Sequence, residues 1–383
     1  MVRRKIMLAV MHELTEKLDW EKKVFDESFV VKWKAEALAG EDPGFSENMF
    51  DDVCVFSFTP PDPLPTTHGS PQSLKCIREL CEKATHFSQA GRVFFLDTEA
   101  AVLKSDSAIP SSLTEELKAV KTLEDVPDRQ KDWHPGTDGK VFGPGTPGTD
   151  WADAGLQVID KLADMELRPE EGKTEYSGGT WHVEGQHNEH SCASAIYYYD
   201  QSNVTDSRLA FRQLTHHDDF TFKAHDQNDY GGVKEIYGVQ NEGPCVQELS
   251  SVLTREGRLL AFPNVLQHRV SPFRLVDPTK PGHRKILALF LVDPYTRTLS
   301  AANITPQQHD WWAEVTCEGV DTKLRKLPLE VFGHVVDVME DGDWPLSLEE
   351  LKRLREDLMS QRRVFVDMVN SDWEQSDWSF CEH

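Results

Sequence analysis

The sequence has little of what a membrane or exported protein needs. No apolar run approaches the roughly 20 residues that span a bilayer, and the mean hydropathy is −0.51. The opening MVRRKIMLAVMHEL has the basic start of a signal peptide, but its apolar run, Ile6 to Met11, ends at His12. That run is too short for the apolar region of such a peptide. We therefore expect a soluble, cytoplasmic protein with no membrane partner.

Cysteines are few and scattered. They form no C-x-x-C pair, and their odd number and irregular spacing give no disulfide framework. This pattern is typical of a protein from a reducing compartment. The seven cysteines are at positions 54, 76, 81, 192, 245, 317 and 381.

Basic residues are also in deficit. Lysine and arginine number 41 against 65 aspartates and glutamates, which gives the 383-residue chain a net charge of −24. A nucleic-acid-binding protein normally carries a basic face that neutralises phosphates. The acidic balance therefore argues against a nucleic-acid partner and favours a small-molecule substrate, including a cationic one.

The first 150 residues are expected to form a helical and wrapping region that ends in a Gly/Pro-rich linker. Spaced apolar positions within residues 5–40 predict amphipathic helices on a core, and residues 72–90 are again rich in helix formers. Residues 91–97 predict a short buried strand, and residues 111–126 a helix with a serine at its start. Turn-forming residues dominate 132–150, which we interpret as the linker.

Short β-rich runs follow the linker at regular spacing. Separated by Gly, Asn, Asp and Pro, they predict a sandwich or jelly roll rather than βαβ units. The runs are LQVIDKLADMEL, GTWHVEG, CASAIYYYD, RLAFRQL, EIYGVQ, VQELSSVL, GRLLAFPNVLQHRV and HRKILALFLVD.

The expected fold class is mainly β with helical extensions, an α+β chain whose core is a cupin-like double-stranded β-helix, or jelly roll. The expected domains are residues 1–150, the β core at 151–316 and a helical extension at 317–383. The extension should be helical from Asp343, with a capping box formed by Ser347 and Glu350.

Two candidate metal ligands lie two residues apart in the run GTWHVEG. On a strand, His182 and Glu184 would point to the same face and could meet at one metal ion. His268 follows a distant β-run that turns at Pro263 and Asn264, and such distant strands are neighbours in a jelly roll. Two histidines and a carboxylate form the facial triad with which Fe(II) oxygenases keep coordination positions open.

An arginine at the start of the last apolar run is a candidate anion ligand. The guanidinium fork of Arg284 can bind a carboxylate through two hydrogen bonds. Because side chains alternate along a strand, the opposite facing would make Lys285 the anchor instead. Tyr197 and Tyr199 share one face of a strand expected beside that of His182, so either could donate to the same ligand. An ordinary aromatic core explains the two tyrosines equally well.

These residues, in this order, resemble the 2-oxoglutarate/Fe(II) dioxygenase superfamily. Its pattern is His-x-Asp/Glu, a distal His after a Gly-x-x-x-x-Phe-Pro strand, then Gly-x-Arg. The matching residues are His182-Val183-Glu184, Gly257 to Pro263, His268, and Gly282-His283-Arg284. The resemblance implies the jelly-roll fold, Fe(II) held by the two histidines and the glutamate, 2-oxoglutarate held by the arginine, and O2 as the other co-substrate.

A closer resemblance is to an uncharacterised domain-of-unknown-function family common in filamentous fungi. It is dense from Leu156 to Trp312 and continues more thinly to the N-terminal helices. It implies no substrate, because that family largely lacks an assigned reaction. The segments that carry it are GGTWHVEGQHNEH, ASAIYYYD, RLLAFPNVLQHRVSPF, DPTKPGHRKILALFLVDP and DWW.

Two features depart from that family. Its members usually carry a long segment between DWHPG and LQVI, where this chain has only the Gly/Pro-rich bridge, so substrate binding is expected to differ. Asp160 and Asp164 also put acids into a strand expected to be less charged.

Two other polar clusters are not interpreted as metal sites. HNEH at 187–190 is one residue short of the H-x-x-E-H helix pattern, and 216–226 fits a solvated loop.

The expected function is a non-haem Fe(II)/2-oxoglutarate-dependent oxygenase that oxidises a small molecule and releases succinate and CO2. Hydroxylation is the default outcome, and desaturation, cyclisation and demethylation are open to the same centre. Two alternatives remain. The shortened middle region suggests a catalytically silent jelly-roll binding or scaffold protein. A cupin-like metalloenzyme with the same ligands but no 2-oxoglutarate would be indicated if Arg284 pointed away from the pocket.

Overall fold

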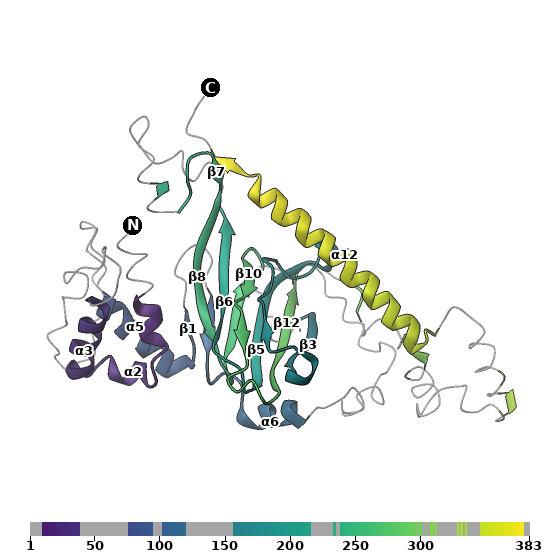
Figure 1. Ribbon diagram of the computed structural model, residues 1–383, viewed down its shortest axis with the longest axis horizontal. Helices are drawn as coiled ribbons and strands as arrows, with labels where there is room; N and C mark the ends of the chain where they lie inside the picture. The colour runs from purple at the N-terminus through teal and green to yellow at the C-terminus, as the bar shows by residue number, and fades with distance from the viewer. Residues whose placement is uncertain are drawn as a thin grey trace.

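Most of the chain is described by the computed structural model (Figure 1). The ranges are 10–38, 76–94, 102–119, 156–215, 238–296 and 345–378, with short pieces at 233–234, 298–300, 304, 307–309, 311, 328, 330–331 and 334. Among these residues, no helix combines the length and apolar character that crossing a membrane requires.

Helices at the N-terminal end pack around a core of their own. α2 (Trp20–Lys23), α3 (Glu27–Leu38) and α5 (Cys76–Ala90) follow a helical turn at 10–15. The predicted amphipathic helices are confirmed, although Leu18 and Phe25 lie exposed in the turns that flank α2. The buried residues of this core are Met11, Leu14, Trp20, Val24, Val30, Trp33, Ile77, Leu80 and Ala84.

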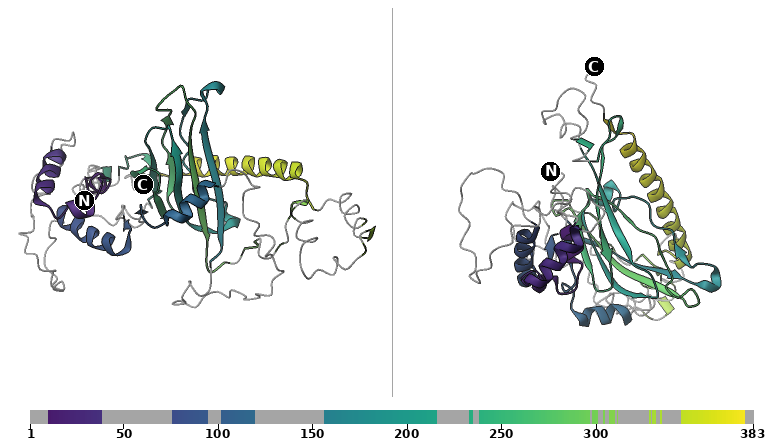
Figure 2. Two further views of the ribbon diagram at one scale, coloured as in Figure 1. Left: turned by 90° about the horizontal axis from the view of Figure 1, so that it is seen from below. Right: turned by 60° about the vertical axis from the view of Figure 1, so that its left-hand side comes forward.

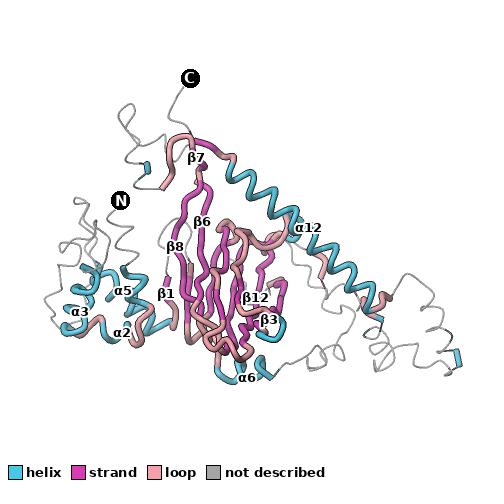
Figure 3. Tube along the Cα trace, in the orientation of Figure 1, coloured by secondary structure: helices cyan, strands magenta, loops and turns pink. Residues whose placement is uncertain are grey.

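The main sheet is antiparallel and has six strands in the order β1-β2-β9-β5-β12-β3. The strands are drawn in magenta in Figure 3. Burial alternates along much of β12, as expected for a strand with one face on a core. The strands are β1 (Val93–Phe94), β2 (Leu103–Ser105), β3 (Val158–Leu167), β5 (Ser191–Ser202), β9 (Leu259–Pro263) and β12 (Gly282–Val292).

A smaller antiparallel sheet packs against the main one. Its order is β10 (Gln267–Val270), β6 (Ser207–Leu214) and β8 (Val246–Thr254). The rings of Phe211 and Phe262, one from each sheet, meet edge to face at 5.0 Å between centroids. The shared core is Val102, Ile196, Tyr198, Leu209, Phe211, Val252, Leu260, Phe262, Leu266, Ala288 and Phe290.

The remaining elements are short strand pairs and peripheral helices. β4 (Glu175–Tyr176) pairs with β11 (Phe273–Arg274), and β7 (Gly243–Pro244) with β13 (Asp377–Trp378); η3 (Pro169–Glu171) follows β3. α6 (Ser111–Ala119) covers β5, and α12 (Leu348–Glu374) begins with the predicted capping box. Figures 1 and 2 show α12 and the N-terminal helices on opposite sides of the sheets.

The two acids in β3 have a structural explanation. β3 is the last strand of the main sheet, and Asp160 and Asp164 are exposed there. A charged edge strand keeps its side chains in water and discourages pairing with another chain. The acids therefore fit the position of the strand.

The fold expected from the sequence is confirmed as α+β with antiparallel sheets. One expected strand is wrong, because GTWHVEG forms only an isolated β-bridge to β10, at His182, and one further hydrogen bond from the Gly179 amide. Glycines with positive φ angles lie on either side, at 178 (99°) and 185 (74°). Residues 238–240 of EIYGVQ form no strand. The linker 132–150, residues 120–126 and 343–344, the rest of EIYGVQ and both domain boundaries lie outside the described residues.

Candidate metal centre

A single β-bridge brings His182 and His268 together. The amide of His182 donates to the carbonyl oxygen of His268 at 3.2 Å, and the reciprocal bond is 2.9 Å. Residues paired in this way carry their side chains on the same side. The two imidazole centroids are accordingly 4.4 Å apart. The β-bridge therefore orients the His182 side chain as the expected strand would have done.

Glu184 completes the group. Its Oε1 lies 3.5 Å from Nε2 of His182 and 3.4 Å from Nε2 of His268. The three ligand atoms are within 4.8 Å of one another. Ligand atoms about 2.1 Å from one ion and at right angles to each other are about 3 Å apart. The three ligand atoms are therefore near enough to share one metal ion, which would draw them closer together on binding.

The charges of the group suit a divalent cation. Burial favours a raised pKa for Glu184, but hydrogen bonds from His182 and His268 outweigh it and hold this pKa well below its usual range. Burial, and then the nearby charge of His182, lower the pKa of His268. Metal ligands must be deprotonated. Glu184 and His268 meet that need. For His182, burial is outweighed by hydrogen bonding to Glu184, which raises the pKa, so metal binding there would release a proton.

Contacts behind the ligands fix their orientation. Nδ1 of His182 donates to the carbonyl oxygen of Thr180 at 2.8 Å, so Nε2 is left to face the centre. The ring of Phe262 meets that of His268 at 4.9 Å and 62°. Gly185, directly after Glu184, has a φ of 74°, and a Cβ there would lie 2.8 Å from Oε2 of Glu189. The turn after Glu184 therefore requires glycine.

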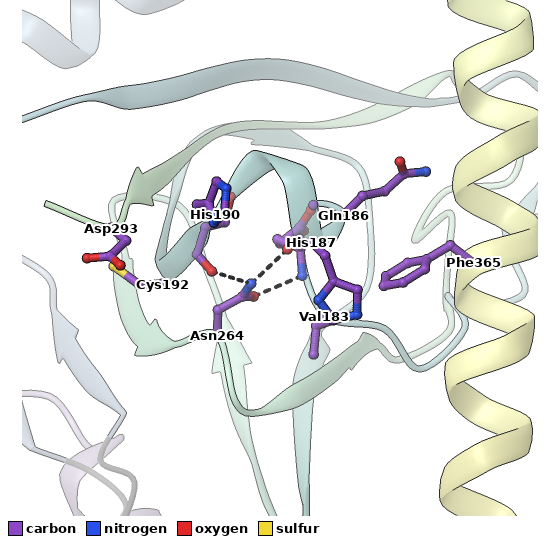
Figure 4. Close-up of a pocket in the computed structure, with 11 residues that line it drawn as sticks. Val183, Gln186, His187, His190, Cys192, Asn264, Asp293 and Phe365 are labelled. Atoms are coloured by element: carbon purple, nitrogen blue, oxygen red, sulfur yellow. Dashed lines mark hydrogen bonds between the residues drawn. The ribbon is translucent and has the colours of Figure 1, made fainter. Parts of the chain in front are cut away.

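Asn264, in the turn after β9, holds the loop that carries Glu184. Its Oδ1 accepts from the Glu184 amide at 2.9 Å, and its Nδ2 donates to the Glu184 carbonyl at 2.7 Å. The same Nδ2 also donates to the carbonyl oxygen of Ser191 at 2.9 Å. Figure 4 shows these bonds at the centre of the site.

Helix α12 supports both histidines from behind. Nδ2 of Asn370 donates to the carbonyl oxygen of Trp181 at 2.9 Å, and its Oδ1 accepts from Gln267 at 3.2 Å and from Arg212 at 3.1 Å. Arg212 also donates from Nε to Oε1 of Gln267 at 2.7 Å. Trp181 and Gln267 directly precede His182 and His268. One helix side chain thus ties the two ligand-bearing segments together.

Arg284 is buried without a hydrogen-bond partner in the part of the chain that the structure describes. Its relative exposure is 0%, and none of its three guanidinium nitrogens has a hydrogen bond to another described residue. The guanidinium lies 4.5 Å from the ring centroid of Phe273 and 6.0 Å from that of Tyr198. Burial lowers the pKa of this arginine. A buried guanidinium normally has an anionic partner, so this site is built for an anion.

A second buried arginine, Arg258, has its charge paired with carboxylates and so provides a comparison for Arg284. Arg258 is also 0% exposed. It donates to Asp106 from Nε at 2.7 Å and from Nη2 at 2.9 Å, and to Glu16 from Nη1 at 2.5 Å. The charge of Arg258 is thus matched by two carboxylates, whereas Arg284 has no hydrogen bond to a carboxylate among the described residues.

Lys285, the alternative anchor, faces the other way. Its Nζ lies 3.5 Å from Oδ2 of Asp200, and its side chain is 22% exposed. The facing of Arg284 is thereby settled in favour of the interior.

The two tyrosines expected near Arg284 are not brought to it. The hydroxyl of Tyr197 bonds to that of Thr114 in α6 at 2.6 Å, on the outer side of β5, and Tyr198 is the tyrosine beside Arg284. A register shift in the β5–β12 pair pairs Ile286 with Tyr198 but Arg284 with Gln201, so Tyr199 is left over as the bulge residue. Tyr197 thus faces α6, and Tyr199 lies near Asp164 and Asp200, because burial and then the charges of these two acids raise its pKa.

The bulge also places a residue that the sequence interpretation missed. Directly opposed residues of an antiparallel pair share one face, so Gln201 faces the interior with Arg284. Its Oε1 is buried and has no hydrogen bond to another described residue. Two neighbouring polar groups are thus left for a ligand.

A pocket of about 370 Å³ adjoins the centre on its outer side (Figure 4). The loop of Glu184, the start of β5, Asn264, Asp293 and Phe365 of α12 line it. The cluster HNEH contributes to this wall and not to the metal group, since the ring of His187 packs on Phe365 at 5.4 Å and Glu189 accepts from Arg362 at 2.6 Å. Both contacts fasten the loop to α12.

Two family models match the chain. The model described as a protein of unknown function (DUF4246) matches residues 72–143 and 146–315, and its N-terminal domain of unknown function matches residues 1–36. The chain belongs to the DUF4246 family. No curated protein matches it. The expected membership of a family of unknown function is thus confirmed. The break in the DUF4246 match, at 144–145, falls in the Gly/Pro-rich bridge.

The DUF4246 match spans the metal group, Asn264 and Arg284, but ends before α12. Of the supporting residues that the sequence interpretation missed, Asn264 is recognisable from the sequence only as a turn residue after Phe262-Pro263. For Asn370 and Gln201 the sequence has no signal, because their roles depend on helix docking and on a bulge. The cluster at 216–226 lies outside the described residues.

Proposed function

We propose that this DUF4246 protein is a non-haem Fe(II) oxygenase that uses 2-oxoglutarate and O2 to oxidise a small molecule. In this proposal His182, Glu184 and His268 hold the iron, and Arg284 holds the distal carboxylate of 2-oxoglutarate. The two packed antiparallel sheets would then be the halves of a double-stranded β-helix, with the metal group between them.

The observation that carries the proposal is the buried guanidinium of Arg284, which has no hydrogen-bond partner among the residues that the structure describes. A two-histidine, one-carboxylate group by itself also suits zinc hydrolases and cupins that use no co-substrate. A buried cationic fork on the interior face of the same core adds a carboxylate site, which neither alternative requires.

The protein's own residues would supply binding and orientation. Arg284 forms two charge-assisted hydrogen bonds with the carboxylate, Gln201 adds a neutral polar contact, and the rings of Phe273 and Tyr198 keep water from the guanidinium. One positive charge then meets one negative charge. This balance favours a carboxylate over a neutral end group.

The bound iron would supply the redox chemistry. 2-Oxoglutarate loses CO2 and gains one oxygen atom of O2 to become succinate. The second oxygen atom enters a substrate C–H bond. O2 takes four electrons, two from 2-oxoglutarate and two from the substrate, so the reaction balances as a hydroxylation.

Anaerobic titration of the Fe(II)-loaded protein with 2-oxoglutarate tests the proposal. We expect a weak visible charge-transfer band that is lost in His268→Ala. In Arg284→Met the 2-oxoglutarate dissociation constant should rise roughly 30-fold or more, the cost of removing one partner of a buried charge pair. Lys285→Met, one residue away on the opposite face, is the matched control and should keep the affinity.

The outcome also separates the alternatives. Iron binding without a band at any 2-oxoglutarate concentration would support a metalloenzyme that does not use this co-substrate. Absence of iron binding would support a silent binding or scaffold protein.

A further inference from the structure

The 370 Å³ pocket lies at the end of the β core opposite to Arg284. β12 runs from Gly282 to Val292, with Arg284 near its start and the pocket residue Asp293 just beyond its end. The neighbouring strand β5 shows the same order, because Gln201 pairs with Arg284 and Cys192 lines the pocket. The pocket and the carboxylate site are therefore at different ends of the same strands.

The pocket also shares a residue with the metal centre. Glu184 both contributes to the metal group and lines the pocket. The adjacent residues Val183 and Gly185 line it as well. A molecule in this pocket would therefore lie against the loop that supplies the carboxylate ligand, while the arginine end stays free for the co-substrate.

The chemical character of the pocket is uneven. Asp293 and Cys192 lie at one side, and Phe365 lies at the other (Figure 4). Among the described lining residues none is a lysine or an arginine. The nearby Arg362 is already paired with Glu189, with 2.6 Å between donor and acceptor. With Glu184 committed to the metal, Asp293 is the one carboxylate left among the described lining residues.

We propose that this pocket binds the oxidisable substrate, and that this substrate is a small monocationic amine. The ammonium group faces Asp293, and the carbon chain extends toward Phe365, past Val183 and Glu184. This inference rests on the proposed oxygenase function and names the substrate class of that same centre. The C–H bond that is oxidised then lies in the carbon chain, away from the charged nitrogen.

Two further observations support the charge assignment. Burial first, and then the charge of Asp293, raise the pKa of the Cys192 thiol, so the field of that carboxylate reaches into the pocket. The Asp293 carboxylate is held in place, since Oδ1 accepts from the Tyr295 amide at 3.0 Å and Oδ2 from the Thr296 hydroxyl at 3.2 Å. A fixed carboxylate selects for a cation better than a mobile one.

Calorimetric titration of the iron-free, full-length protein with three probes of equal chain length tests the inference. The probes are pentylammonium, 1-pentanol and pentanoate. We expect pentylammonium to bind about tenfold more tightly than 1-pentanol, because the ammonium group adds a charge-assisted contact. Pentanoate should bind most weakly. Equal binding of the amine and the alcohol, or tighter binding of pentanoate, would overturn the inference.

Two aspartate variants locate the effect. Asp293→Asn should remove the preference for the amine over the alcohol. Asp277→Asn is the matched control, because Asp277 caps a similar turn through Thr279, with bonds of 3.0 Å and 2.6 Å, outside the pocket. The preference for the amine over the alcohol must be retained in Asp277→Asn. A preference that persists in Asp293→Asn would place the cation elsewhere and overturn the inference.

A third readout separates this inference from the proposed function. Pentylammonium added to the anaerobic Fe(II)/2-oxoglutarate protein should shift the visible band, because the pocket and the metal share Glu184. A normal band that the amine does not move overturns the substrate role alone. A missing band overturns the oxygenase function, and with it the substrate role, even if the amine binds at Asp293.

Discussion

Asn264 and Glu184 are joined by a reciprocal pair of hydrogen bonds between one side-chain amide and one peptide unit, at 2.9 Å and 2.7 Å. A side-chain amide with this geometry replaces the strand partner that the Glu184 loop lacks. The carboxylate ligand is therefore positioned by the turn after β9 and not by a ladder of its own. The precision of the metal group depends on this one side chain.

Asn264→Ala should weaken metal binding by about 10–100-fold, the range typical for residues that support a ligand. Both main-chain bonds to Glu184 are lost, so its carboxylate is no longer held at the distance that the two histidines require. Competitive titration of Fe(II) or Co(II) against a metal indicator measures the change.

Asn203→Ala provides the matched control for the Asn264 variant. Asn203 braces another loop in the same manner, with Nδ2 donating to the Asp277 carbonyl at 3.0 Å and Oδ1 accepting from its amide at 2.8 Å. A similar loss of thermal stability with unchanged metal affinity is expected there. If both variants lost metal affinity equally, the loss would reflect general destabilisation, and the special role of Asn264 would be rejected.

The two buried arginines should respond oppositely to substitution. Arg258→Met removes one cationic partner from each of the carboxylates of Glu16 and Asp106 and should lower the free energy of unfolding by about 3–5 kcal/mol. Arg284→Met removes an unpaired buried charge and should raise this free energy by about 1 kcal/mol or more. Urea unfolding of the ligand-free variants measures both.

Addition of 2-oxoglutarate should make the wild-type protein more stable than Arg284→Met. The wild-type protein gains stability from ligand binding, and the Arg284 variant gains almost none. If Arg284→Met destabilised the ligand-free protein as strongly as Arg258→Met, the guanidinium would have a structural partner, and its role as a ligand site would be withdrawn.

Sequence patterns identified what is local or linear in this protein. The ligand types, their order, the helices from α2 to α6 and the capping box of α12 follow from spacing, propensity and end signals that lie within a few residues of each other. The proximity of His182 and His268 could also be predicted from the sequence, because few folds have these ligand motifs in this order along the chain.

Features set by distant contacts were not accessible. The register shift between Lys285 and Ile286 changes which residues of β5 face inward, and it made Tyr197 and Tyr199 the wrong candidates. Alternation along one strand cannot reveal a bulge that depends on its partner. The support of both histidines by α12 depends on how a helix from the C-terminal region docks, and no pattern in the helix itself specifies that contact.

Asn370→Ala on α12 should weaken metal binding by about tenfold while leaving the helix formed. The substitution removes the bonds to Trp181 and Gln267, which precede the two histidine ligands. Metal titration and circular dichroism together measure the effect. Asp367→Ala, on an exposed position of the same helix, is the control and should change neither quantity. Equal metal affinity in the two variants would contradict a supporting role for α12.

Acid should destabilise the protein through His12. This side chain is 3% exposed, and Arg208 donates to its Nε2 at 2.9 Å. Burial, and then the positive charges of Lys104, Arg208 and Arg258, lower its pKa from 6.5 to about 2. As the pH falls below 6.5, the unfolded chain takes up a proton at this residue and the folded protein does not. The free energy of unfolding should therefore fall by about 1.4 kcal/mol per pH unit, or about 2 kcal/mol between pH 7 and pH 5.

The difference between wild type and His12→Gln isolates this contribution, because the glutamine amide oxygen can accept from Arg208 but does not titrate. The urea-unfolding midpoints of the wild type and of His12→Gln should converge from pH 7 to pH 5, because only the wild type loses stability through this residue. His334→Gln, at an exposed position, should track the wild type throughout. A parallel pH dependence in wild type and His12→Gln would mean that His12 is protonated in the folded protein, contrary to the contact with Arg208.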